Sequence, residues 1–138
     1  MVQSSGQTYA VVVRADTVSQ ASAIARGHTL SLNIQKGGSL GFNAAETLLA
    51  ALGTCILTNI ESLSQKMRIE IQGARMELTA ERSDDPPGLT RIDYRLVLQS
   101  GADKDKLEHL HHLAVRWGTV TNTLARGIVP TGDLIVEQ

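Results

Sequence analysis

Residues 42–57 of the chain read FNAAETLLAALGTCIL, and this stretch decides the fold. Apolar residues recur at steps of three or four from Leu49 to Met67, which is the period of an α-helix. Asn43 is a favourable N-cap, and Glu46 follows three residues later, where a capping box requires it. The sequence therefore predicts a long helix that runs from about residue 44 to residue 66.

The first half of this helix is apolar on nearly every side, because residues 48–57 contain one hydroxyl group and no charge. A helix that is apolar all round is buried all round. We therefore expect a central helix that is covered by a sheet and by a second subunit. The predicted assembly is a homodimer whose interface exceeds ~2,000 Å², as in permanent complexes.

The rest of the chain predicts short strands and one more long helix. Alternating apolar residues mark the strands, and clusters of turn-forming residues separate them. The expected strands cover residues 9–14, 23–35, 69–82, 89–99 and 133–136, and the further helices cover 103–117 and 122–126. The 138 residues fit a single domain, residues 1–138, of the α+β class.

Composition excludes several classes of function. The net charge is −1 and only four residues are aromatic, so the chain lacks the positive field and the stacking platforms of nucleic-acid binders. We expect no apolar run of the ~18 residues that span a membrane. Residues 1–7 do not have the pattern of a secretory signal. A cytoplasmic location is predicted, with neither nucleic acid nor membrane as a partner.

Cys55 is the single cysteine, so an internal disulfide and a zinc site of several thiolates are both excluded. Two interpretations stay open. A free cysteine often packs like a small hydrophobe, and an ionised thiol can attack an electrophile.

Other polar groups favour structural roles. His109 and His112 have i,i+3 spacing but lack a metal-binding pattern, whereas His111 leans toward the apolar side of its helix. Residues 37–41 resemble neither nucleotide fingerprint and match a nucleophile elbow around Ser39 only weakly. No metal and no cofactor are expected.

Three segments resemble the OsmC/Ohr family of osmotically induced and organic-hydroperoxide-resistance proteins. They are residues 42–55, the hairpin residues 81–92, and Val120-Thr121-Asn122-Thr123-Leu124. The resemblance implies the OsmC-like fold, β-β-α-β-β-α-β, with antiparallel sheets packed on the long central helix of an intertwined homodimer. It also implies active sites at the dimer interface, where the helix thiol attacks peroxides.

The chain departs from the family pattern at two chemical positions. The second, resolving cysteine of the family falls on Gly118, and the glutamate of the peroxide-reducing members falls on Ala45. Glu46 matches a glutamate of other branches, although it lies about 180° around the helix from Cys55. The peroxidases also use an arginine from the N-terminal strands, where this chain has Arg14 and Arg26.

The predicted catalytic residues are therefore Cys55, Arg14 and Glu46. The predicted function is thiol-dependent reduction of an organic hydroperoxide, with an external thiol as reductant. The alternative is a non-catalytic dimer that binds an apolar ligand in a pocket at the interface and uses Cys55 only for packing.

Overall fold

The computed structural model describes residues 6–137, and the chain divides into two compact units between Leu48 and Leu49. Both combine antiparallel strands with helical segments, since the long helix begins in the first unit and continues through the second. The predicted α+β class is confirmed.

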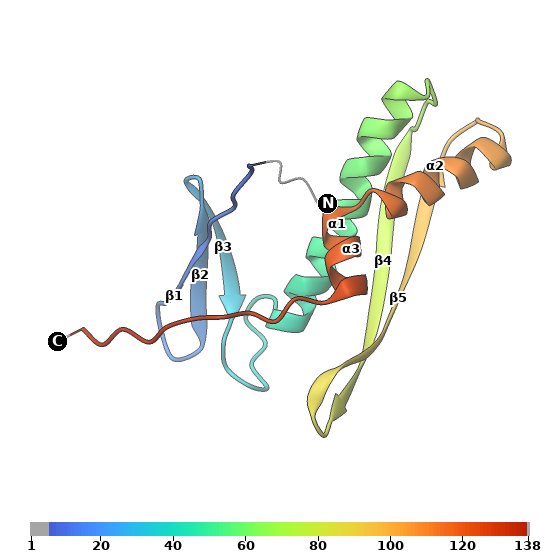
Figure 1. The fold of residues 1–138 in the computed structure, drawn as a ribbon. Coiled ribbons are helices and arrows are strands. Elements are labelled where there is room, and N and C mark those ends of the chain that lie inside the picture. The colour runs from blue at the N-terminus through green and yellow to red at the C-terminus, as the bar shows by residue number, and fades with distance from the viewer. Residues whose placement is uncertain (1–5, 138) are drawn as a thin grey trace. The chain divides into compact units, whose positions relative to one another are not determined.

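The first unit contains a three-stranded antiparallel sheet in the order β1-β2-β3 (Figure 1). The strands are β1 (Val12–Ala15), β2 (Gln20–Ala25) and β3 (His28–Asn33). The prediction of one strand region over residues 23–35 was wrong, because the chain reverses at Arg26 and Gly27, which have φ values of 51° and 81°. An Arg-Gly pair lacks the Asn-Gly or Asp-Gly signal by which such hairpin turns are usually recognised.

Helix α1 (Ala44–Lys66) has the predicted bounds. Its N-terminus is a capping box: the Asn43 backbone N–H donates to Glu46 Oε1 at 3.0 Å, and the Glu46 N–H donates to Asn43 Oδ1 at 2.8 Å. Two backbone donors that the helix leaves unsatisfied are thereby paired.

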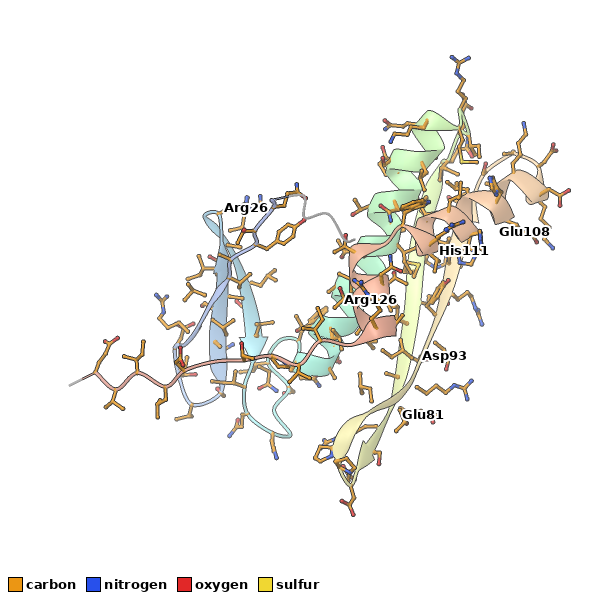
Figure 2. All side chains as sticks on the ribbon, viewed as in Figure 1. Arg26, Glu81, Asp93, Glu108, His111 and Arg126 are labelled. Carbon is orange, nitrogen blue, oxygen red and sulfur yellow. The ribbon has the colours of Figure 1, made fainter. Side chains whose placement is uncertain are left out.

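The second unit packs α1 and α2 (Lys104–Arg116) against one face of a long hairpin, β4 (Gly73–Asp84) and β5 (Pro87–Gln99) (Figure 1). The Asn59 side chain of α1 donates to the Ala114 carbonyl of α2 at 3.0 Å. The buried core residues are Leu52, Ile56, Ile60, Ile69, Leu110 and Ala114. The outer face of the hairpin is charged, with Glu81 and Asp93 on the side away from α1 (Figure 2).

Two boundaries differ from the prediction. Pro87 pairs with Asp84, so the hairpin turn is shorter than the turn expected over residues 83–88. The strand expected at residues 133–136 was wrong: residues 127–137 form neither helix nor strand. An alternating pattern of apolar residues alone cannot form a strand, because the backbone N–H and C=O groups need a neighbouring strand as hydrogen-bond partner.

The last helix, α3 (Thr119–Arg126), is longer than the predicted helical turn at residues 122–126. The Asn122 side chain donates to the Arg116 carbonyl at 3.1 Å and so ties α3 to the end of α2.

Helix α1 is the one helix within residues 6–137 that is long and apolar enough to cross a membrane, by length and composition. This test is looser than the uninterrupted apolar run considered in the sequence, since α1 contains Glu46, Asn59 and Glu61. The signal is weak, because the core helix of a soluble protein passes the same test. Leu52, Ile56 and Ile60 of α1 are buried in the core of the second unit.

Candidate active site around Cys55

Cys55 lies in the middle of α1 and is half-buried. Gly53 faces the hairpin, since a Cβ on it would lie 3.0 Å from Leu78 Cδ1. At 100° per residue, Cys55 points to nearly the opposite side of α1. The thiol is therefore turned away from the side of α1 on which Gly53 contacts the hairpin.

Gly118 approaches the thiol from a distant part of the sequence. A Cβ on Gly118 would lie 3.1 Å from Cys55 Sγ. Gly118 is the position at which the sequence places the second cysteine of the family pattern. The fold thus brings this position to the sulfur, close enough for a disulfide if residue 118 were a cysteine.

Gly118 is also the N-cap of α3, with an extended backbone (φ −82°, ψ 125°). The N-terminal end of a helix carries partial positive charge and favours a nearby anion. The first turn of α3 has no acidic residue that would neutralise this charge. The residue that approaches the sulfur therefore stands at the N-terminal end of α3, which carries partial positive charge.

Thr121 reaches the same place from the first turn of α3. Its Oγ1 lies 2.7 Å from the Cβ position of Gly118. This oxygen is buried and has no hydrogen-bond partner in the described part of the chain. Sequence reasoning did not select Thr121 as a site residue, although the third family-like segment, residues 120–124, contains it.

Arg14 lies on β1 and forms an ion pair with Asp16, with Nε 3.2 Å from Oδ1. The Ser22 hydroxyl and then the Arg14 guanidinium donate to this carboxylate and lower the pKa of Asp16. The Arg14 side chain is 66% exposed, so its guanidinium is open to a further anion. Arg26 lies at the turn between β2 and β3 (Figure 2).

Glu46 lies in the first turn of α1, where its carboxylate accepts the Asn43 N–H. This contact gives it a structural role as a cap. Its predicted catalytic role stays a prediction, and so does that of Arg14.

His111 lies toward the hairpin, as its place in the sequence predicted (Figure 2). Its Nε2 is 2.6 Å from the Tyr94 hydroxyl, and the two rings meet edge to face at 5.7 Å. Burial raises the pKa of Tyr94. Within residues 6–137, no three His, Cys, Asp or Glu side chains are grouped as a metal site.

A family model described as OsmC-like protein matches residues 36–131, which include α1, the hairpin, α2 and α3. The chain belongs to the OsmC-like protein family. No curated protein matches at the level of sequence.

Solved structures confirm the fold of this OsmC-like chain. An OsmC-like protein from Mycoplasma pneumoniae superposes with a TM-score of 0.80 at 22% identity, over 87% of this chain and 89% of the other. The organic hydroperoxide resistance protein OhrB of Bacillus subtilis gives 0.60 at 17% identity, over 85% and 90%. A protein from Legionella pneumophila described as an organic hydroperoxide resistance protein OsmC gives 0.65 at 13%, over 88% and 91%.

Proposed function

We propose that this OsmC-like protein reduces organic hydroperoxides, with Cys55 as the attacking thiolate and an external thiol as the reductant. One observation carries the proposal. Gly118, at the second-cysteine position, lies against Cys55 with its Cβ position 3.1 Å from Sγ. The spacing of a two-cysteine site is therefore kept around Cys55, although residue 118 carries no thiol.

The chemistry balances with one protein thiol. The Cys55 thiolate attacks the distal oxygen of the hydroperoxide, the O–O bond breaks, and the alkoxide leaves as an alcohol after taking a proton. The sulfur is oxidised by two electrons to a sulfenic acid. An external thiol then displaces water to give a mixed disulfide, and a second external thiol releases the Cys55 thiol. Gly118 cannot take the place of the first external thiol.

The names of two fold relatives support the substrate class. The Bacillus subtilis and Legionella pneumophila proteins are both described as organic hydroperoxide resistance proteins. A reducing cytoplasm would supply the external thiol that the mechanism needs.

We infer that the working form is a homodimer. Within α1, Leu48, Ala51 and Thr54 are exposed, although the helix is apolar on nearly all sides. A second subunit would cover this surface, which a monomer leaves to water. It would also bring further charged groups to the site, with Arg14 as the candidate cation and Glu46 as the candidate carboxylate.

The direct test is the consumption of tert-butyl hydroperoxide in the presence of a small dithiol. We expect wild type to consume it and Cys55→Ser to lose all activity above background. Gly118→Cys should form an internal disulfide after one equivalent of peroxide. Because the new Cβ would lie 2.7 Å from Thr121 Oγ1, that variant requires Thr121 to rotate.

The role of Arg14 has a matched control. Arg75 on β4 pairs with Glu77 at 3.0 Å and is 65% exposed, much like Arg14 with Asp16. If Arg14 stabilises the thiolate, Arg14→Ala should slow the alkylation of Cys55 at pH 7 by roughly tenfold or more, the effect of losing one close charge. Arg75→Ala should leave the rate unchanged. Equal rates in all three proteins would remove Arg14 from the mechanism.

The alternative is a dimer that binds an apolar ligand at its interface without catalysis. The glycine at position 118 favours it, because the internal resolving thiol is missing. If wild type and Cys55→Ser consume peroxide equally with every reductant tried, the binding function replaces the catalytic one.

A further inference from the structure

The hydroxyl group of Thr121 is an unusual group in this protein. Three other helical threonines, Thr47, Thr58 and Thr123, each donate to the carbonyl four residues earlier, at 2.7 to 2.8 Å. Thr121 also lies in a helix, yet its Oγ1 is buried and has no partner among residues 6–137. A buried hydroxyl without a partner costs free energy, so such a group needs an explanation.

The position of this hydroxyl suggests its partner. Thr121 Oγ1 and Cys55 Sγ lie 2.7 and 3.1 Å from the same point, the Cβ position of Gly118. Both atoms therefore face the same side of the Gly118 α-carbon. Because residue 118 has no side chain, nothing of its own separates the hydroxyl from the sulfur.

We propose that the Thr121 hydroxyl donates a hydrogen bond to the oxygen that Cys55 acquires from the peroxide. This inference rests on the proposed function, since it concerns the sulfenic acid of that reaction. The donor pairs with the sulfenate oxygen and draws electron density from the sulfur. The sulfur then attacks a second hydroperoxide more slowly, so less sulfinic acid forms.

The proposal explains how one cysteine can serve without a resolving partner. A sulfenic acid next to a second thiol is quickly consumed as a disulfide. Here it must persist until an external thiol arrives. Thr121 thus preserves the sulfenic acid of Cys55, because Gly118 offers no thiol with which it could form a disulfide.

The test compares the lifetime of the sulfenic acid in four proteins. Each is treated with an excess of tert-butyl hydroperoxide, so that oxidant remains for a second oxidation. The sulfenic acid is trapped with dimedone at intervals, and Cys55 is analysed by mass spectrometry. Thr121→Val keeps the shape and removes the donor, whereas Thr121→Ser keeps the donor. Thr123→Val is the matched control, because it removes a hydroxyl of the same helix that is already bonded to the Thr119 carbonyl.

We expect the sulfenic acid of Thr121→Val to disappear about tenfold faster than in wild type, with more sulfinic acid, as the loss of one charge-assisted hydrogen bond implies. Thr121→Ser and Thr123→Val should resemble wild type. If Thr121→Val does not fold, Thr121→Ala provides the same comparison. Equal lifetimes in wild type and the donor-free variant overturn this inference alone. An unmodified Cys55 in wild type overturns the proposed function and this inference with it.

Discussion

The two antiparallel sheets of this protein differ in how they treat their apolar side chains. In the β4–β5 hairpin, apolar residues alternate onto one face and pack against α1 and α2. In the β1–β3 sheet, register places Val13, Ala23 and Leu30 in one row. Val13 and Leu30 at the ends of that row are 59% and 61% exposed.

The hairpin is thus covered by helices of its own unit, whereas in the described part of the chain the β1–β3 sheet has no helix of its own unit packed on this row. Soluble monomers rarely expose contiguous apolar patches, and here Val11, just before β1, is exposed as well as Val13 and Leu30. We infer that the Val13–Ala23–Leu30 row belongs to a surface that a second copy of the chain covers.

A charged side chain in the Val13–Ala23–Leu30 row should have the largest effect, which is on the assembly of the homodimer. We expect Leu30→Lys to abolish the homodimer, because a buried unpaired charge is strongly destabilising. Thr79→Lys, on the outer face of the hairpin, should change stability by less than about 0.5 kcal/mol. Sedimentation at micromolar concentration measures the loss of the dimer, and urea unfolding measures the stability of Thr79→Lys. A folded wild-type monomer under these conditions would contradict the predicted assembly.

The second largest effect should come from shortening a side chain in the core between the helices and the hairpin. Leu110 is fully buried between α2 and the hairpin. Leu110→Ala should lower the free energy of unfolding by about 2–5 kcal/mol, since it removes packed methyl groups and leaves a cavity. Urea unfolding measures the change. Leu113→Ala, which is only half-buried on the same helix, serves as the control and should cost less.

The smallest effect concerns Asp16 in the first sheet. Hydrogen bonds from Ser22 and then Arg14 hold the pKa of Asp16 below its ordinary value of 3.8. A lowered pKa in the folded state means stability that is present above the unfolded pKa and lost as the pH falls through the folded pKa. Ser22→Ala should raise the pKa of Asp16 toward 3.8, measured by NMR titration. Ser31→Ala on β3 should not move it.

Much of the fold could be predicted from the sequence, because the patterns that specify its helices and strands are local. The bounds of α1 follow from apolar spacing and from the Asn43–Glu46 box, both of which act within a few residues. Helix α2 and the two hairpin strands were recognised for the same reason. The β2–β3 turn was missed because Arg26 carries none of the usual turn chemistry, and the strand at 133–136 was wrong because a strand depends on a neighbour that the pattern cannot supply.

The same distinction between local patterns and tertiary packing applies to the candidate site. The sequence by itself determined that one thiol sits on the apolar helix, that residue 118 has no side chain to resolve it, and that Glu46 caps α1. Only the tertiary structure decided that Gly118 and the unpaired hydroxyl of Thr121 lie beside that thiol. Contacts between residues more than sixty positions apart depend on how α1 and α3 pack, and packing is set by the whole core rather than by any local pattern.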